Sequence, residues 1–575
     1  MSLFLPRRLQ TRDLLSSEEF DCYDGFGQGV FQRRLLLLCI LVICVKHCHV
    51  YVIPLTLRDV DHWCKRPEHW NMSTQEWKNV AIPLEVDGHY SRCRQYADLD
   101  NINDTATVPC VAWEYDQEQV TTSIVSQWDL VCHRRLLRAA LVVFNGAGTI
   151  IVGIVAGSVA DTIGRRPVLL ASTVTLVTST LALCLVRRYA LYVLVEFVAS
   201  GSASALYVVT SVLFFEITTH ENRPLHLVIA GAVGTVISGL WFAIMALLSI
   251  NWKLMQAIFL LPTAFSAAAF CVVVESPRWL VAKARLREAE DVMLVAAETN
   301  LFPLHNTACL LDKLKNKASE TGQQEQHAAY VELLQGVSIR KRAIVMYFSC
   351  FSVTFVLRVV LSSSIMRQSR MLNWISMVVV MVSFAAMFLL ITRVTLLKFT
   401  SVCFAVLGVL QCVLSLTATS NLLIVKQTLA TSSKALVFVG YIVLGAYSFE
   451  LLPTGVRGAA AGWTHGFGGV GATMAYLGIP LQRMGREDVS FAIAGSLMFA
   501  SLLALRTLPE NTTAECAKTA VRRESVFREQ NMERMKKTLE QRECKENREP
   551  SCQSRRSKSS TASEKSTASA RSRKR

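Results

Sequence analysis

Charged residues are scarce in this chain of 575 residues: Asp, Glu, Lys and Arg make up 18% of it and hydrophobic residues 52%. Soluble domains carry about 25% charged residues, and disordered chains contain too few apolar residues to form a core. The composition therefore excludes disorder for most of the chain and argues against one ordinary soluble domain. Because the apolar residues cluster in long runs, the sequence favours a membrane protein.

The sequence also lacks the signatures of several chemistries. It contains no P-loop, which argues against an ATP-driven pump, and no zinc-finger or RNA-binding signature that would make nucleic acid a partner. We expect no enzyme, because no nucleophile, base and oxyanion donor gather on a polar segment, and no cofactor. Cys44, His47 and Cys48 share one helical face at a spacing that suits a soft metal, but a fourth ligand is not evident, so we predict no metal site.

The apolar runs predict twelve membrane spans, because one span needs about 20 apolar residues. They cover roughly 34–55, 138–158, 168–186, 190–213, 225–248, 253–274, 342–363, 373–391, 396–418, 431–450, 458–480 and 489–508. A polar segment separates the first six spans from the last six, as in transporters built from two repeats. The predicted fold class is an all-α membrane protein with two six-helix, pseudo-symmetric halves, residues 34–276 and 342–508.

The distribution of Lys and Arg predicts the orientation of the spans, because cytoplasmic loops carry the excess of positive charge. Positive residues gather on one side of the predicted spans, at Arg33, Arg34, Arg165, Arg166, Arg278, Arg340, Arg342 and Arg457. That side holds the N-terminus 1–33, the partly helical loop 277–341 and the tail 509–575. We predict a multi-pass protein of the plasma membrane, with both termini in the cytoplasm and residues 57–137 outside the cell.

The C-terminal tail carries most of the excess positive charge. The formal net charge of the chain is +16, and residues 518–575 hold 18 Lys or Arg against 8 Asp or Glu. Residues 554–575 are rich in serine, so we expect the tail to be largely disordered. A basic tail beside a membrane suits contact with anionic lipids, and a solvated tail without a specific partner fits the sequence equally well.

The predicted extracellular segment contains four cysteines outside the apolar runs, Cys64, Cys93, Cys110 and Cys132. An even set of cysteines in a polar, extracellular stretch predicts a disulfide framework, and the sequence leaves all three pairings open. The same segment contains two N-glycosylation sequons, which begin at Asn71 and Asn103. The cysteines and the sequons agree with the outside location that the charges predict.

Short motifs flank the predicted spans. Residues 161–167 read DTIGRRP, 275–280 read ESPRWL, 61–64 read DHWC, 127–132 read QWDLVC, 25–32 read GFGQGVFQ and 449–457 read FELLPTGVR. In this order and spacing, over about residues 25–510, they resemble the signatures of the organic cation/anion/carnitine transporter family of the major facilitator superfamily. The second half departs from that pattern, because residues 392–395, TRVT, keep one arginine of the repeated GRR turn. The chain therefore resembles a divergent member.

The resemblance implies that the chain carries small organic ions, which are cations, anions or zwitterions such as carnitine, by alternating access. It also implies a gate at the cytoplasmic ends of the spans, where partly hydrated charge pairs break at low cost. The candidate gate residues are Asp161, Arg165, Arg166, Glu216, Arg223, Glu275, Arg278, Glu450 and Arg457. The alternative interpretation is that these charges only set the topology and cap helices.

Ionisable and polar residues inside the spans are candidates for substrate contact. Arg358 in the seventh span would bind a carboxylate or sulfonate, unless it pairs with an acid such as Glu196 in the fourth span. Lys46 and Lys434 suit snorkelling or the gate. The polar-tipped residues that could line a cavity are Asn145, Tyr207, Trp241, Tyr441 and Tyr447.

The sign of the substrate charge stays open at this stage. The resemblance places a charge-selecting residue twelve positions after Arg457, and this chain has the neutral Gly469 there. The eighth span, 373–391, contains no acid, although cation carriers of the family tend to have one. Arg358 tilts the interpretation toward anions or zwitterions, while Glu196 would suit a cation.

No energy source is visible, so we expect facilitated diffusion or exchange. Two other functions remain as alternatives. A sugar-porter-like carrier is disfavoured by the outer segment with its cysteines. A non-transporting receptor or scaffold on a carrier fold stays open because the motif of the second half is reduced.

Overall fold

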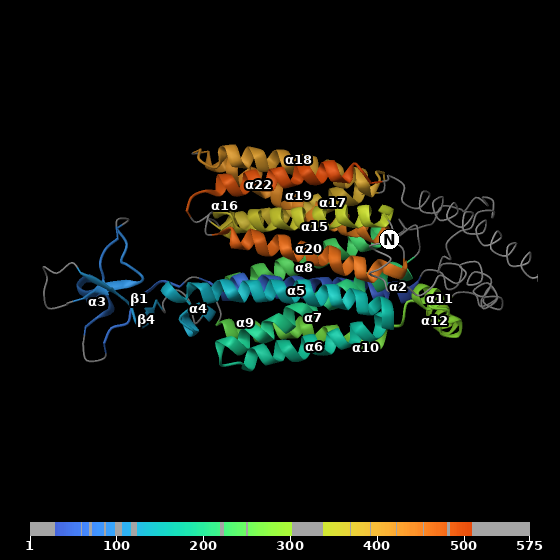
Figure 1. The fold of residues 1–575 in the computed structure, drawn as a ribbon, viewed down its shortest axis with the longest axis horizontal. Helices are drawn as coiled ribbons and strands as arrows, with labels where there is room; N and C mark the ends of the chain where they lie inside the picture. Colours follow the sequence, from blue (N-terminus) through green and yellow to red (C-terminus); the bar gives the residue numbers. More distant parts are fainter. Residues whose placement is uncertain are drawn as a thin grey trace, which may run out of the picture. The chain divides into compact units, whose positions relative to one another are not determined.

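Long helices make up most of the described part of this computed structural model (Figure 1). The structure describes residues 29–58, 60–67, 72–85, 88–97, 106–116, 123–218, 223–248, 251–301, 337–367, 370–391, 393–420, 422–451, 454–479 and 484–508. All of them lie within the unit Glu19–Glu510. The predicted glycosylation sites Asn71 and Asn103, the stretch 1–28 and the tail 509–575 lie outside the described residues.

Each predicted span coincides with a helix. The helices of the first half are α2 (Val30–Thr56), α5 (Arg135–Ile163), α6 (Arg165–Leu185), α7 (Tyr189–Ile217), α8 (Arg223–Leu248) and α9 (Trp252–Phe265), followed by a 3-10 turn and α10 (Ala269–Val272). Those of the second half are α15 (Val337–Ser362), α16 (Ser364–Arg367), α17 (Arg370–Ile391), α18 (Leu396–Thr417), α19 (Leu423–Glu450), α20 (Arg457–Leu477) and α22 (Glu487–Leu505). The largest difference is at α19, which begins at Leu423 rather than at residue 431.

Among the described residues, eleven helices are long and apolar enough to cross a membrane. The remaining predicted span is α20, in which glycine and alanine replace many of the large apolar side chains. This helix packs against α5 on one side and α15 on the other (Figure 1). The prediction of twelve spans is thus approximately confirmed, with α20 assigned by its position among the other helices.

Glycines allow α20 to approach α5 closely. A Cβ atom built on Gly458 of α20 would lie 2.5 Å from the carbonyl oxygen of Gly157 on α5. One turn further along, a Cβ on Gly462 would lie 2.7 Å from the carbonyl oxygen of Gly153. The two backbones are therefore in direct contact, as expected for glycines four residues apart on facing helices.

The described part of the 57–137 segment contains short strands. Strand β1 (His62–Cys64) pairs with β4 (Trp113–Tyr115), and β2 (Arg94–Tyr96) pairs with β3 (Thr107–Pro109), both antiparallel. Disulfides join Cys64 to Cys110 and Cys93 to Cys132, which selects one of the three possible pairings. The all-α description therefore holds for the membrane helices but not for this segment. The strands were not predicted, because three residues are too few to show the alternating pattern of a strand.

The QWDLVC motif anchors this segment to the membrane helices. The ring of Trp128 lies 5.4 Å from that of Trp252 at the start of α9, and Gln127 Oε1 accepts a 2.8 Å hydrogen bond from Trp252 Nε1. Asp129 accepts a 2.9 Å hydrogen bond from the hydroxyl of Tyr115. Burial and this hydrogen bond raise the pKa of Tyr115 above its ordinary value. The motif therefore connects strand β4 to α9.

The ESPRWL motif begins two short helices at the opposite end of α5 (Figure 1), α11 (Pro277–Ala282) and α12 (Leu286–Thr299). Asn300 follows α12 and holds the first turn of α2. Its Oδ1 accepts a 2.9 Å hydrogen bond from the Phe31 backbone N–H, and its Nδ2 donates a 3.0 Å bond to Gln32 Oε1. The end of the GFGQGVFQ motif thus binds the segment after α12.

Replacing Gly471 of α20 by alanine is expected to destabilise the protein, because the added Cβ would collide with the Phe351 carbonyl oxygen of α15. Overpacking of this kind costs about 1–3 kcal/mol, and the apparent melting temperature of the purified protein in detergent should fall. Gly445→Ala on α19 is the matched control, because a Cβ there meets nothing within 4 Å. Equal melting temperatures for the two variants would contradict the close contact.

Candidate functional site

A cluster of buried charges joins the ends of α5, α6 and α7. At its centre is Arg165, the first residue of α6, which is fully buried rather than partly hydrated as predicted. Its Nε and Nη2 donate to the two carboxylate oxygens of Glu216 on α7, at 3.0 Å each. Nη2 also lies 2.9 Å from Asp161 Oδ1 on α5. The planar guanidinium suits this arrangement, because its donors form a fork that matches a carboxylate.

The start of α20 joins this cluster from the second half. Asp161 accepts hydrogen bonds from the backbone N–H groups of Gly458 at 3.2 Å and Ala459 at 2.8 Å. The first N–H groups of a helix have no intrahelical partner, and the helix N-terminus favours negative charge. Arg457 Nη1 lies 3.3 Å from Glu216 Oε1. The same two carboxylates therefore bind α6 in one half and α20 in the other.

Glu275 holds the turn between α5 and α6. Its two oxygens accept hydrogen bonds from the backbone N–H groups of Arg165 at 2.8 Å and Arg166 at 3.1 Å. Gly164 has a φ angle of +113°, and a Cβ there would collide with Glu275, so this turn requires glycine. Trp279 Nε1 donates a 3.0 Å hydrogen bond to the backbone carbonyl oxygen of Asp161. The DTIGRRP and ESPRWL motifs are therefore the two sides of one contact.

We refer to Asp161, Arg165, Glu216, Glu275 and Arg457 as the rim cluster. The other predicted gate residues lie beside it. Arg166 takes part through its backbone, since its side chain is exposed. Arg223 is buried, and its Nε donates a 2.9 Å hydrogen bond to the backbone carbonyl oxygen of Thr218, the residue after α7. Arg278 is buried in α11, and Glu450 ends α19 without an ion pair to any described residue.

A second group of polar side chains lies between the helices. The ammonium of Lys46 on α2 is 5.1 Å from the ring centroid of Tyr207 on α7 and 5.8 Å from that of Tyr441 on α19. The Tyr207 ring lies 5.0 Å from the His465 ring on α20. We refer to these four residues as the central layer. Sequence reasoning missed His465, although an ionisable residue inside a span is itself a signal.

The other predicted substrate contacts are placed differently. Arg358 is half-buried on α15, close enough to Lys46 for the two charges to repel each other. Asn145 Nδ2 on α5 donates a 3.0 Å hydrogen bond to Glu196 Oε1 on α7, so the buried acid is bound by an amide rather than by an arginine. Gly469 faces α5, where an added Cβ would lie 2.9 Å from Cγ1 of Ile150. Gly469 therefore serves helix packing in this structure.

Two predicted aromatic contacts and the helical face of Cys44, His47 and Cys48 are not part of the central layer. Tyr447 is 2% exposed and belongs to the large hydrophobic core of the bundle. Trp241 lies on α8, where it packs against α9. Cys44 and Cys48 contact each other, and the described residues place no three-ligand cluster at Cys44, His47 and Cys48.

A cavity of about 260 Å³ lies between α8 of the first half and α17 and α19 of the second. Its lining includes two cationic side chains, Arg58 and Lys434, and the rings of Phe242, Trp374 and Phe438. Tyr441 follows Lys434 by seven residues, which is two helical turns, so both lie on the same face of α19. The cavity therefore lies on the side of α19 that carries the central layer.

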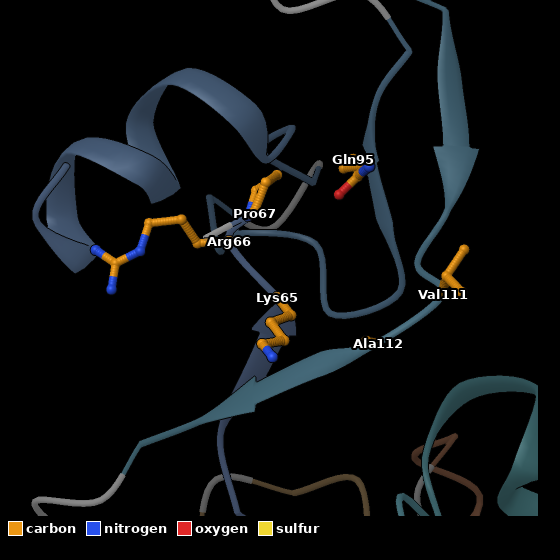
Figure 2. A pocket seen from close by; sticks show the side chains of 6 residues that line it. All are labelled: Lys65, Arg66, Pro67, Gln95, Val111 and Ala112. Atoms are coloured by element: carbon orange, nitrogen blue, oxygen red, sulfur yellow. The ribbon is translucent and has the colours of Figure 1, made fainter. Parts of the chain in front are cut away.

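Another cavity, of about 270 Å³, lies in the 57–137 segment (Figure 2). It is lined by Lys65, Arg66, Pro67, Gln95, Val111 and Ala112. Figure 2 shows Arg66 extending away from Gln95 and Val111, and Val111 is 91% exposed. These side chains do not converge on one point, so we do not take this cavity as the candidate site.

The arrangement of motifs and helices agrees with comparisons to known proteins. A family model described as "Sugar (and other) transporter" matches residues 99–511. The chain belongs to this family. A solved structure of the major facilitator superfamily proton:xylose symporter XylE aligns with a TM-score of 0.59. The two sequences are 13% identical, and the alignment covers 84% of this chain and 97% of that one. A partially occluded, inward-open XylE from E. coli aligns with a TM-score of 0.55. The predicted major facilitator fold is confirmed.

Curated relatives confirm the resemblance to the organic-ion branch, since several are members of solute carrier family 22. Member 7 of Mus musculus is 27% identical over 57% of this chain and 64% of that protein. Member 6-A of Xenopus laevis is 24% identical over 84% of this chain and 90% of that protein. A "Beta-alanine transporter" of Drosophila melanogaster is 25% identical over 57% of this chain and 60% of that protein. The chain thus spans less than two thirds of the mouse and fly relatives.

Glu216→Gln keeps the shape of the side chain but replaces the carboxylate that Arg165 and Arg457 share with a neutral amide. Because breaking a buried ion pair from one side costs about 3–5 kcal/mol, the apparent melting temperature should fall. A cysteine introduced at Ala459, which is buried at the start of α20, should also react faster with a maleimide when Glu216→Gln is present than when it is absent. Mass spectrometry of that site measures the reaction.

The matched control for this experiment is Glu298→Gln, which changes an exposed glutamate on α12. It should alter neither the melting temperature nor the reactivity of the cysteine. A lower melting temperature in Glu216→Gln with unchanged reactivity at 459 would mean that the cluster stabilises the fold without holding the two halves together.

Proposed function

We propose that this chain is a membrane transporter, not an enzyme, which moves small organic ions across the plasma membrane by alternating access. The observation that carries the proposal is the contact of Asp161 in the first half with the first N–H groups of α20 in the second. A contact between two halves at one end of the helices has to break when that end opens.

In this proposal the rim cluster is the inner gate. Its charges are paired and hydrogen-bonded while the gate is closed, so their burial is compensated. When the gate opens, water reaches the same groups and replaces the lost partners. Because neither state leaves a charge unpaired in an apolar environment, the two states can lie close in free energy. This is the property that a gate needs.

We also propose the orientation of the chain. The rim cluster and both termini would face the cytoplasm, and the 57–137 segment would face the outside. The two disulfides of that segment support this orientation, because disulfides persist in oxidising compartments. The basic tail would then lie near the inner leaflet, whose anionic lipids attract positive charge.

The second candidate function is sugar transport, and the description of the matched family model favours it. The relatives named as members of solute carrier family 22 and as a beta-alanine transporter favour organic ions instead. A receptor on a carrier fold would bind ligand without moving it. These functions differ in which compounds enter a vesicle.

Purified full-length protein in liposomes should take up at least one charged compound from a panel of benzoate, phenyltrimethylammonium and carnitine, with saturation. Glucose should not enter faster than into protein-free liposomes. Preloading the same ion inside should accelerate uptake, as expected for exchange. Glu216→Gln should slow uptake, because the gate no longer closes firmly, while Glu298→Gln should not. Saturable glucose uptake, or binding of a charged compound without entry, would overturn the proposal.

Enzymatic removal of N-glycans from the protein made in animal cells should lower its apparent mass. Asn71→Gln and Asn103→Gln should each remove part of this shift, and the double variant should abolish it, because both sequons face the secretory lumen in the proposed orientation. A third sequon begins at Asn511 and lies on the cytoplasmic side in the proposed orientation, so Asn511→Gln is the control and should change nothing. A glycan at Asn511 would reverse the proposed orientation.

A further inference from the structure

The central layer lies at one depth in the bundle. Tyr207 precedes Glu216, at the end of α7, by nine residues, and Tyr441 precedes Glu450, at the end of α19, by nine residues. His465 follows Arg457, at the start of α20, by eight. With a rise of 1.5 Å per residue, all three lie about 12–14 Å from the rim end of their helices. Lys46 therefore meets aromatic rings from both halves near the middle of the membrane.

The charge in this layer is positive and has no carboxylate partner. Among the described residues, Lys46 makes neither a salt bridge nor a hydrogen bond, and its contacts are the faces of Tyr207 and Tyr441. Its titratable neighbours are Arg358 and Cys350 on α15 and His465 on α20, and none of them is a carboxylate. Two aromatic faces attract an ammonium but do not neutralise its charge. The layer therefore holds a cationic donor whose natural complement, an anion, is supplied by no described side chain.

The intramembrane acid Glu196 lies elsewhere. It precedes Tyr207 by eleven residues on α7, which corresponds to about 16 Å along the helix. It is 1% exposed, and one of its oxygens accepts a hydrogen bond from Asn145. Glu196 is therefore too far from the central layer and too deeply buried to attract a cation into it.

The cavity beside the central layer has the same sign of charge. Arg58 and Lys434 are its two ionisable lining residues among those that the structure describes, and the rest of its wall is apolar apart from Thr235. Lys434 Nζ donates to Ser376 Oγ at 2.7 Å and has further donors to offer. The central layer and the cavity therefore each present positive charge, and no carboxylate is among the described residues that form them.

We propose that the central layer binds an organic anion, a carboxylate or sulfonate on an aromatic or apolar body. This inference rests on the proposed transport function and specifies its substrate class. Lys46 pairs with the anionic group, and the rings of Tyr207, Tyr441 and His465 contact the body. An organic cation of the same shape is repelled by Lys46 and Arg358.

The test compares probes of similar shape and opposite charge. Benzoate and benzenesulfonate are the anionic probes, and phenyltrimethylammonium is the cationic one. Equilibrium binding to the purified full-length protein and uptake into liposomes are measured separately. We expect binding and uptake of an anionic probe and neither for the cationic probe. Lys46→Gln should weaken anion binding roughly 10- to 100-fold, the range for losing one charged hydrogen bond, and Lys46→Arg should restore most of it.

Lys398→Gln is the matched control, because Lys398 is an exposed lysine at the start of α18. It should leave anion binding unchanged, and equal melting temperatures should show that all variants are folded. Binding or uptake of the cationic probe alone, anion binding that is unaffected in Lys46→Gln, or no anion binding at all would each overturn the anion site. Anion binding that depends on Lys46 but is not followed by uptake would support the site and overturn the transport function.

Discussion

The buried fork between Arg165 and Glu216 is the interaction on which the packing at the rim depends. Removing two charges from water is costly, and their mutual attraction compensates only if the remaining donors and acceptors are also satisfied. Here Asp161 and Arg457 provide these partners, and both are themselves held by the start of α20. The donors of Arg165 are satisfied within the first half, but Asp161 and Glu216 also bind the start of α20, so the cluster is complete only when helices from both halves are present. A pair within one half would stabilise that half alone.

The glycines of α5 and α20 follow from the same requirement. A carboxylate can accept hydrogen bonds from the first N–H groups of another helix only if the two backbones are very close. Gly157 and Gly458 allow this approach, since a Cβ at Gly458 would also lie 2.6 Å from Asp161 Oδ1. The absence of side chains at this crossing therefore serves the electrostatics as well as the packing. It also explains why α20 is less rich in large apolar residues than a span usually is.

The sequence predicts the features of this protein that depend on runs of apolar residues or on short motifs. The apolar runs locate the helices, and the motifs identify Asp161, Arg165 and Glu275 as a group. The pairing cannot be predicted from the sequence, because only folding brings Glu216 to Arg165 and Arg457 to Glu216. The disulfide pairing stayed open for the same reason. The central layer was only partly recognised, because Lys46 and His465 come from helices far apart in sequence and each alone resembles an isolated polar residue.

Helix α20 contains residues of the rim cluster, of the α5 crossing and of the central layer. Arg457 and His465 are eight residues apart, about 12 Å along one rigid helix. A movement of α20 that separates Gly458 from Asp161 would also displace His465 relative to Tyr207, which belongs to the other half. Conversely, a ligand that draws Lys46, Tyr207 and His465 together acts on the same helix that closes the rim. In the proposed mechanism, occupancy of the central layer and the state of the rim would therefore be coupled through one helix, and a ligand would shift that equilibrium only by the difference in its affinity for the two states.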